Sequence, residues 1–243
     1  MTTRIAMWSG PRNISTAMMR AFGNRADCHV VDEPFYAAYL TLTGLNHPMR
    51  EEIIADMETD PQVVAGSLVG TVPGNRPVFY QKHMTHHMLS DIPRDWMDST
   101  SHAFLIRRPE NVLASYAAKR QEVDLRDIGF VEQCEIFDAV AQKTGTPPPV
   151  IDAFDVLTNP SAILQQLCKR LGIAFTDAML SWRPGRWPTD GVWAQHWYGT
   201  VEASTGFTTP TDPVAFDALP DHLKAIAEQA RSYYDRLHAF ALR

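Results

Sequence analysis

Several residues in the segment SGPRNIST, residues 9–16, are of the types that bind anions. Arg12 carries a fixed positive charge with forked donors, and Ser15 and Thr16 add hydroxyl donors. The segment follows RIAM, which is typical of a buried strand, and precedes helix-forming residues. A helix N-terminus offers free backbone N–H groups and the positive end of its dipole, which suits phosphate. Gly10 would let the backbone approach such a ligand closely. The turn is therefore a candidate anion site.

This turn does not match the P-loop pattern G-x-x-x-x-G-K-[ST], because it lacks a second glycine and a Lys-Ser/Thr pair. The mismatch weakens the case for a nucleoside triphosphatase that uses Mg²⁺. For the turn alone a structural alternative stays open, in which Ser15 or Asn13 caps the helix and Arg12 lies in solvent.

A second cation follows another apolar run, in FLIRRPENVLASYAAKR. Arg107 ends this run, Pro109 turns the chain, and Ser115 lies in the next expected helix. A turn that folds back would bring the guanidinium group and the hydroxyl onto one phosphate. The alternative is that Arg107 and Arg108 are surface charges and that Ser115 faces solvent or core.

Short apolar runs alternate with helical patterns along the chain. Strands are predicted over 5–8, 28–34, 78–83, 102–109 and 150–157, and helices over 15–24, 35–43, 48–58, 60–68, 110–121, 128–143, 159–173 and 220–241. This order predicts an α/β fold with three layers, α/β/α, around a mostly parallel central sheet. Residues 182–213, rich in Trp, Gly, Pro and Thr, predict an ordered loop. Without a repeat or a linker, residues 1–243 are predicted to form a single domain.

Ligands of such sheets bind beyond the carboxyl ends of the strands. The candidates for chemistry are therefore the residues that follow each strand, which are 9–16, Asp32, Glu33, Lys82, His83, Arg107, Arg108 and Asp155.

The net charge of −6 gives no global reason to expect nucleic acid or an anionic membrane as a partner, so any anion site must be local. No apolar run reaches the ~18 residues that span a bilayer. Three widely spaced cysteines suit free thiols in a reducing compartment and form no zinc pattern. Because nothing resembles a signal peptide, we expect a cytoplasmic protein.

Together these segments resemble the sulfotransferases that use 3′-phosphoadenosine-5′-phosphosulfate (PAPS). PRNIST is similar to the family's phosphosulfate loop, P-[KR]-[ST]-G-[ST]-T, at positions 11, 12, 15 and 16, and departs from it at positions 13 and 14. Arg107 and Ser115 have the spacing of the motif that holds the 3′-phosphate. FDVLTNPSAILQQLCKRLGI is similar to a third family segment, Y-E-D-L-x-x-x-P…L-x-x-L-G-[IL]. The three segments occur in the family's order over roughly two thirds of the chain.

The resemblance implies a P-loop-like sulfotransferase fold, PAPS as co-substrate, and two cradles at opposite ends of one nucleotide. Arg12 would stabilise charge at the sulfuryl group, and Arg107 with Ser115 would hold the 3′-phosphate. In the family a basic C-terminal loop completes the site; here the candidate is SWRPGRWPTDG, with Trp182 on adenine or packed on the core. The implied nucleotide-binding residues are Gly10, Pro11, Arg12, Asn13, Ile14, Ser15, Thr16, Arg107, Ser115, Trp182, Arg183, Gly185 and Arg186.

In-line sulfuryl transfer needs a base near the sulfur and, in principle, no metal. Glu33 in VVDEPF is the first choice, since it follows the second strand. The alternatives are that Glu33 pairs with a nearby arginine, or that Asp32 caps a helix and Glu33 is exposed. His83 is the competing base, with Lys82 as a sulfuryl clamp, and His196 is a remoter candidate. QKHMTHH lacks the further ligand that a zinc site would need.

The expected acceptor is a hydroxyl or amine of a small molecule. Residues 35–76 and 182–213 are expected to wall its pocket. Aromatic residues there predict an apolar or aromatic pocket, unless they belong to the core; they are Phe35, Tyr36, Tyr39, Trp193, Trp197 and Tyr198. Two other functions stay open: a P-loop-like kinase or phosphotransferase, which would need Mg²⁺, and a nucleotide-binding module without catalysis.

Overall fold

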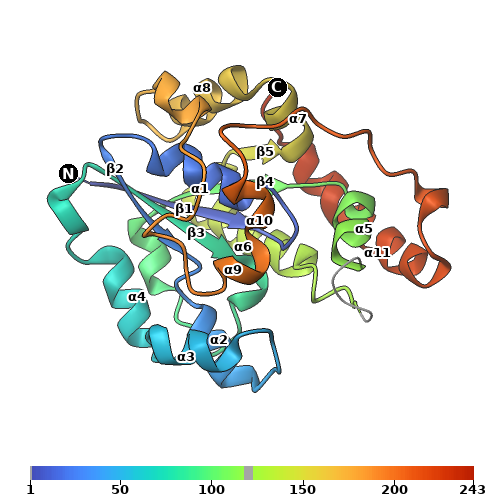
Figure 1. Ribbon diagram of the computed structural model, residues 1–243, viewed down its shortest axis with the longest axis horizontal. Helices are drawn as coiled ribbons and strands as arrows, with labels where there is room; N and C mark the ends of the chain where they lie inside the picture. Colours follow the sequence, from blue (N-terminus) through green and yellow to red (C-terminus); the bar gives the residue numbers. More distant parts are fainter. Residues whose placement is uncertain (1, 118–122) are drawn as a thin grey trace.

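The structure is a computed structural model, and it describes residues 2–117 and 123–243. Within these residues, one sheet of five parallel strands forms the centre, in the order β2-β3-β1-β4-β5 (Figure 1). The strands are β1 (Thr3–Ser9), β2 (Cys28–Asp32), β3 (Val78–Met84), β4 (Ser101–Ile106) and β5 (Val150–Asp152). The predicted α/β class and parallel sheet are confirmed.

The described helices, in chain order, are α1 (Ser15–Gly23), α2 (Tyr36–Thr43), α3 (Arg50–Asp56), α4 (Pro61–Val69), α5 (Pro109–Ala117), α6 (Phe130–Thr144), α7 (Ala153–Thr158), α8 (Pro160–Arg170), α9 (Ala194–Trp197), α10 (Gly199–Glu202) and α11 (Asp221–His238). Short 3₁₀ helices are η1 (Pro73–Asn75), η2 (Thr85–His87), η3 (Asp95–Ser99), η4 (Asp177–Leu180) and η5 (Phe216–Ala218). None of the described helices is both long and apolar enough to cross a membrane.

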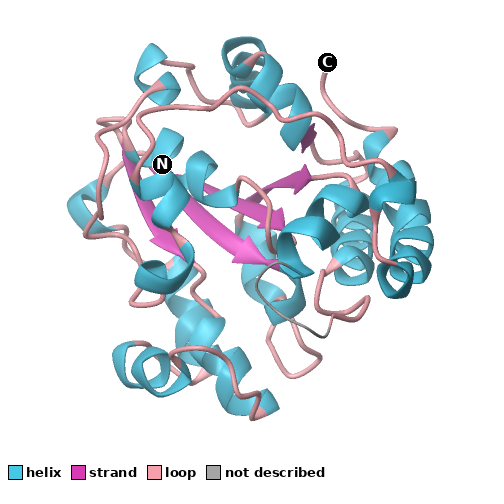
Figure 2. Ribbon diagram, turned by 45° about the vertical axis from the view of Figure 1, so that its right-hand side comes forward, coloured by secondary structure: helices cyan, strands magenta, loops and turns pink. Residues whose placement is uncertain are grey.

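The sheet separates two hydrophobic clusters, which gives the three predicted layers. β1 is central, and its side chains alternate between them: Ile5 and Met7 lie in one cluster, Ala6 and Trp8 in the other. Because both faces of the strand are buried, its sequence is continuously apolar. Helices α1, α7 and α8 contribute to the first cluster, and α4, α5, α6 and α11 contribute to the second. Figure 2 shows the strands at the centre with helices around them.

Short polar side chains fix where several helices begin. Asp60 accepts a hydrogen bond from the backbone N–H of Gln62 at the start of α4. Asn159 does the same for Ala162 at the start of α8, whose first residue is a proline. This cap explains why the helix begins at Pro160, close to its prediction.

The fifth strand is shorter than predicted. It ends at Asp152, and 153–158 form α7 instead of continuing the strand. The reason is local, because the Asp152 side chain accepts from the backbone N–H of Phe154 at 2.7 Å and so caps a helix. The end of the helix predicted over 110–121 lies outside the described residues.

The segment 182–213 was predicted as an ordered loop, and it contains the two short helices α9 and α10. An ion pair fastens it to α1, in which the buried Arg20 guanidinium binds both carboxylate oxygens of Asp190 at 2.6 Å. Trp187 stacks on this guanidinium, 4.6 Å from ring centroid to Cζ. The segment therefore lies over the ends of the strands in one defined position (Figure 1).

Candidate active site

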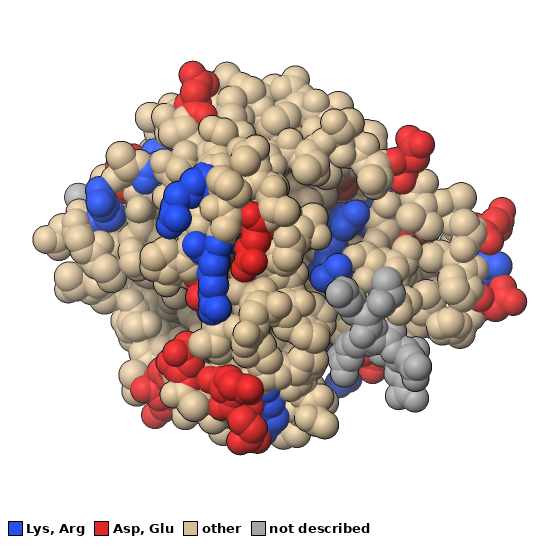
Figure 3. Space-filling model, viewed as in Figure 1, with Lys and Arg blue, Asp and Glu red and all other residues tan. Residues whose placement is uncertain are grey.

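A cavity of about 380 Å³ lies beyond the carboxyl ends of β1, β3 and β4. The space-filling view shows the molecule hollowed near its centre, with basic and acidic side chains beside the hollow (Figure 3). The turn between β1 and α1 forms the floor, and the segment carrying α9 and α10 forms a wall. This is the place where parallel α/β sheets bind ligands, as the sequence predicted.

The turn from β1 into α1 presents an open helix N-terminus to the cavity. No side chain caps α1, and Ser15 and Thr16, its first two residues, line the cavity. The Asn13 side chain shapes the turn, since its amide nitrogen donates to the Leu105 carbonyl at 3.1 Å and its oxygen accepts from Ile14 N–H at 2.9 Å. The free N–H groups and the helix dipole make this end suited to binding an anion.

Gly10 has a different role from the predicted one and does not line the cavity. A Cβ at this position would lie 2.4 Å from the carbonyl oxygen of Ile128, before α6. The glycine is thus required by packing against this segment, which corrects the prediction of a close approach to ligand.

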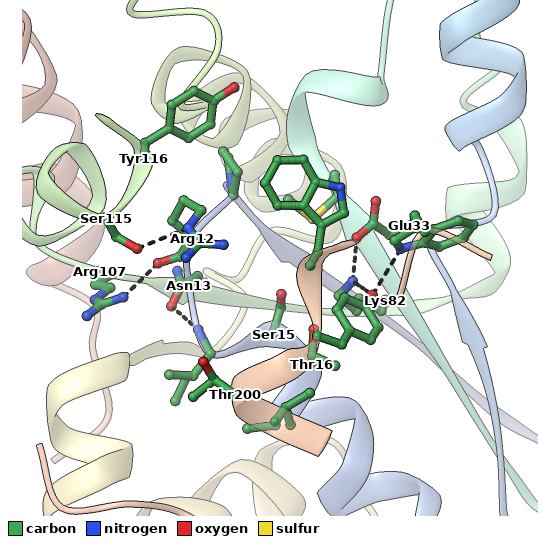
Figure 4. A pocket seen from close by; sticks show the side chains of 18 of the residues that line it. Arg12, Asn13, Ser15, Thr16, Glu33, Lys82, Arg107, Ser115, Tyr116 and Thr200 are labelled. Atoms are coloured by element: carbon green, nitrogen blue, oxygen red, sulfur yellow. Dashed lines mark hydrogen bonds and ion pairs between the residues drawn. The ribbon is translucent and has the colours of Figure 1, made fainter. Parts of the chain in front are cut away.

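Arg12 and Arg107 lie together at one end of the cavity, beside Ser115 (Figure 4). The Arg12 Nε donates to Ser115 Oγ at 3.0 Å, and the Arg107 Nη1 donates to the Arg12 carbonyl at 2.7 Å. Arg12 has a φ of 56°, in the left-handed region. The sequence placed the two arginines at opposite ends of a nucleotide. In the structure the Arg12 carbonyl accepts from Arg107 and the Arg12 side chain donates to Ser115, and the places of the two arginines along a nucleotide stay a prediction.

These two guanidinium groups have no carboxylate within ion-pair distance among the described residues. Burial lowers the pKa of Arg12. Burial also lowers the pKa of Arg107, the charge of Arg12 lowers it further, and Asp152 opposes the shift without cancelling it. Two neighbouring cations without an ion-pair partner among the described residues favour an anion beside them.

The opposite end of the cavity holds a buried network around Lys82 (Figure 4). The Lys82 ammonium donates to Asp32 Oδ1 at 2.8 Å, to Glu33 Oε1, and to the Tyr198 hydroxyl at 2.8 Å. Tyr198 donates to Asp32 Oδ2 at 2.7 Å and accepts from the indole N–H of Trp193. All three protons of the ammonium are therefore engaged. This corrects the prediction of Lys82 as a sulfuryl clamp: the lysine holds Glu33 in place.

Glu33 lines the cavity directly after β2. Burial raises the pKa of this carboxyl; Lys82 opposes the shift without cancelling it, and Asp32 adds to it. For Lys82, burial acts to lower the pKa, but the two carboxylates raise it well above its usual range. The pair therefore combines a permanent cation with a carboxylate whose basicity exceeds that of an exposed glutamate.

His83 does not reach the cavity. Successive side chains of β3 point to opposite faces, so Lys82 faces the cavity and His83 faces the second hydrophobic cluster. Its ring stacks on Trp8 at 4.6 Å and Trp96 at 4.9 Å. Burial lowers the pKa of His83 to about 3. It is a neutral core residue, which corrects its prediction as a base.

The C-terminal candidates also lie away from the cavity. Trp182 is buried, and its indole donates to Ser204 Oγ at 3.1 Å. Arg183 and Arg186 are exposed and line no part of the cavity. Gly185 and His196 do not line it either. The part of this segment that reaches the cavity lies later in the chain, at Trp193, Trp197, Tyr198, Thr200, Val201, Ser204, Gly206, Phe207 and Thr208.

Aromatic and imidazole side chains wall the cavity beside Glu33. Of the predicted aromatic residues, Tyr36, Trp193, Trp197 and Tyr198 line it. Phe35 is buried in the second hydrophobic cluster, and Tyr39 packs against the first. Sequence reasoning missed three further lining residues, His47, His86 and His87. Burial lowers the pKa of His86 to about 3, so this imidazole is neutral, and its Nδ1 has no partner among the described residues.

Sequence could have pointed to two of these histidines, since THH follows the third strand directly and η2 carries both. His47, between α2 and α3, gave no such signal; its position depends on the contact of its ring with the Tyr36 hydroxyl. Over the residues that the structure describes, no group of three or more His, Cys, Asp or Glu could hold a metal ion.

Comparison with known proteins identifies the family of this chain. The family model described as "Sulfotransferase domain" matches residues 3–241. Two Arabidopsis thaliana proteins named branched-chain-amino-acid aminotransferase-like protein 2 and protein 1 are 38% and 40% identical to this chain over 85% of its length. The match covers 36% and 37% of their own length, so the chain spans about a third of these curated relatives.

Solved structures share the fold at low sequence identity. The sulfotransferase domain from the curacin biosynthetic pathway has a TM-score of 0.56 at 18% identity, covering 96% of this chain and 97% of that chain. A sulfotransferase from Alicyclobacillus acidocaldarius has a TM-score of 0.55 at 11% identity, covering 100% and 98%. With a family model that matches nearly from end to end, the chain belongs to the sulfotransferase domain family.

Proposed function

We propose that the protein transfers a sulfuryl group from PAPS to a hydroxyl or amine of a small-molecule acceptor. One observation carries this proposal: a single cavity joins a pair of arginines without acid partners to a buried carboxylate, past an open helix N-terminus. A nucleotide with an anionic group at each end can bind cations at one end and helix N–H donors at the other. A nearby carboxylate supplies the base for the acceptor.

In this proposal the 3′-phosphate binds at Arg107 and Ser115. The 5′-phosphosulfate lies along residues 11–16, where the N-terminus of α1 and the hydroxyls of Ser15 and Thr16 face the cavity. These donors would stabilise the charge that builds on the leaving phosphate as the sulfuryl group departs. The 3′ end thus receives the Arg107 guanidinium and the Ser115 hydroxyl, and the 5′ end receives the donors of residues 11–16, among them backbone N–H groups and hydroxyls.

Glu33 is the proposed base. The acceptor oxygen or nitrogen forms a bond to sulfur while the bond from sulfur to the 5′-phosphate oxygen breaks, and the acceptor's proton passes to the Glu33 carboxylate. The raised pKa of Glu33 suits this transfer, and Lys82 keeps the carboxylate oriented. The aromatic and neutral imidazole side chains around it suit an acceptor with an apolar or aromatic body.

A binding titration tests the proposal most directly. We expect 3′-phosphoadenosine-5′-phosphate (PAP), the product nucleotide, to bind tightly without metal, and ATP with Mg²⁺ to bind weakly. Arg107→Ala should reduce PAP affinity sharply, while the exposed, cavity-remote Arg186→Ala should not. If ATP with Mg²⁺ binds better than PAP, the kinase alternative replaces this one.

Transfer of labelled sulfate from PAPS to a panel of small alcohols, phenols and amines separates an enzyme from a binding module. The enzyme proposal expects transfer that Glu33→Gln suppresses. Tight PAP binding with no acceptor sulfated by the wild-type protein would favour the non-catalytic module.

A further inference from the structure

We infer that Tyr198 is a positioning residue, which makes Glu33, and not its neighbour Asp32, the carboxylate that takes up the acceptor's proton. This inference rests on the proposed function, because it concerns the proton that the acceptor releases there. The two carboxyl groups share the ammonium of Lys82, so the buried network offers two places for this proton. Hydrogen bonds, the state of the phenol and access to the cavity separate these two places.

The backbone brings both carboxyl groups to the same ammonium. Asp32 is the last residue of β2, and consecutive side chains of a strand point to opposite faces. Glu33 leaves the strand with a φ of 43°, in the left-handed region. Lys82 therefore reaches both groups, donating to Asp32 Oδ1 at 2.8 Å and to Glu33 Oε1.

Hydrogen-bond donors divide unequally between these carboxyl groups. Asp32 Oδ1 accepts from Lys82. Its Oδ2 accepts from the Tyr198 hydroxyl at 2.7 Å and from the backbone N–H of Gly191 at 3.4 Å. Glu33 accepts at Oε1, and its Oε2 makes no hydrogen bond to the described residues. Because donors favour the charged form of a carboxylate, this division directs the proton to the free oxygen of Glu33.

The Tyr198 hydroxyl is a fixed donor to Asp32. It accepts from the Lys82 ammonium at 2.8 Å and from the indole N–H of Trp193 at 3.1 Å. These two donors fill the acceptor capacity of a hydroxyl, so its one proton is left for Asp32. Burial raises the pKa of Tyr198 well above its usual range; Asp32 adds to the shift, and Lys82 opposes it without cancelling it. The phenol therefore keeps its proton.

Access to the cavity separates the two carboxyl groups in the same sense. Glu33 lines the cavity, whereas Asp32 does not. In the transfer step the acceptor's proton bonds to Glu33 Oε2, and Tyr198 and Lys82 keep their own protons. The segment 182–213, which carries Tyr198, thus contributes to the base without touching the proton.

Other titratable groups surround Glu33. They are Tyr36 on α2, His47 between α2 and α3, Lys82 on β3, His86 and His87 on η2, and Tyr198. The pKa of both phenols and of Lys82 is raised, while burial lowers the pKa of His86 to about 3 and that of His87 well below its usual range. His47 contacts the Tyr36 hydroxyl. The carboxyl pair is therefore the place where a proton is taken up beside the acceptor.

A ¹³C NMR titration of the side-chain carboxyl groups locates the proton without any need for transfer. Glu33→Gln and Asp32→Asn assign the two signals. In the wild-type protein we expect the first proton that the pair takes up on acidification to appear at Glu33. Tyr198→Phe removes the hydroxyl and keeps the ring, so Asp32 should take a share of this transition. The ratio of Glu33-bound to Asp32-bound proton should fall about 10- to 100-fold, as for a lost hydrogen bond to a charged group.

Tyr234→Phe is the matched control, because Tyr234 is also buried, donates to Asp152 Oδ2 at 2.8 Å and does not line the cavity. It should leave the ratio unchanged, and circular dichroism verifies that each variant is folded. Asp32→Asn provides a second test: in this background Tyr198→Phe should not move the Glu33 transition further, since the charge that the hydroxyl serves is gone. An unaltered ratio in Tyr198→Phe, or a wild-type proton at Asp32, would overturn the inference.

Kinetics connect this assignment to the proposed function. Tyr198→Phe should lower kcat for transfer from PAPS about tenfold, part of the contribution of a general base, and change PAP affinity by less than about twofold. A loss of PAP affinity with unchanged kcat would contradict the inference. The proposed function fails separately, if the wild-type protein sulfates no acceptor while the titration still places the proton on Glu33.

Discussion

At the scale of single residues, Glu33 combines two properties that oppose each other. It is buried, which raises its pKa, and it contacts a permanent cation, which lowers it. The effect of burial on the pKa is the larger of the two, so the carboxylate is more basic than that of an exposed glutamate. The ammonium of Lys82 fixes its orientation. Its φ of 43° is also left-handed, and the backbone N–H of Glu33 donates to the Lys82 carbonyl at 2.9 Å. Through Lys82, strand β3 thus contacts both the backbone and the side chain of the proposed base.

Replacing Glu33 with Gln removes the proton acceptor and keeps the shape. We expect turnover to fall by about 10²- to 10⁴-fold with PAP affinity retained. The wild-type rate should decline as pH falls, because protonation disables the base, with a midpoint above the ordinary carboxyl value of 4.5. A pH–rate profile checks this, and the variant should lose that acid limb. An unchanged limb in Glu33→Gln would assign the base to another group.

Lys82→Met tests the buried network. It removes the cation and leaves Asp32 and Glu33 buried beside each other, so we expect a loss of about 3–5 kcal/mol in the free energy of unfolding. Denaturant unfolding measures the loss. Lys143→Met is the matched control, because Lys143 pairs with Asp98 at an exposed site, where such pairs contribute under about 1 kcal/mol. Equal losses in both variants would show that the Lys82 network contributes no more than a surface pair.

At the scale of elements, the order of strands and helices followed from sequence because it depends on local periodicity. The sequence also shows that Lys82 and His83 are consecutive in a strand, so they must face opposite sides of the sheet. The prediction of both as site residues did not take this into account. Only one of them could reach the site.

Contacts between distant segments could not be predicted in this way. Tyr198 bonds to Asp32 across 166 positions, and Arg12 bonds to Ser115 across 103. The bond between Tyr198 and Asp32 depends on how residues 182–213 cross the sheet. The bond between Arg12 and Ser115 depends on a left-handed φ at Arg12, and no glycine at this position indicates that conformation in the sequence. The position of the site could be predicted from the ends of the strands. The contacts of each side chain there depend on tertiary structure and could not.

The segment that walls the cavity is anchored by the pair Arg20–Asp190, whose side chains are 1% and 0% exposed. Asp190→Ala would leave the Arg20 charge buried and release the segment from α1, so we expect a loss of about 3–5 kcal/mol. Limited proteolysis should then cut within 182–213 faster than in wild type. Asp138→Ala, at the exposed pair with Arg236, is the control and should change neither measurement appreciably. Undiminished protease resistance in Asp190→Ala would show that other contacts hold the segment.

At the scale of the whole molecule, the net charge of −6 contrasts with the cations in the cavity. Exposed acids cover parts of the surface, among them Glu51, Glu52 and Asp56 on α3. A surface of this sign disfavours polyanions in general. Binding of a small bisphosphate therefore depends on local groups, and each group comes from a different part of the chain: 11–16, Arg107 and Ser115, and the segment with α10.

Because these parts meet around one cavity, a nucleotide bound there should stabilise the chain as a unit. At a PAP concentration of 100 times its Kd, we expect a gain of about 2.7 kcal/mol in the free energy of unfolding. If residues 1–243 form a single domain, calorimetry should show one transition, which PAP moves as a whole. Arg107→Ala should remove most of the shift, and Arg186→Ala should preserve it. Two transitions, with only one moved by PAP, would instead show that the chain folds as separate units and that the cavity belongs to one of them.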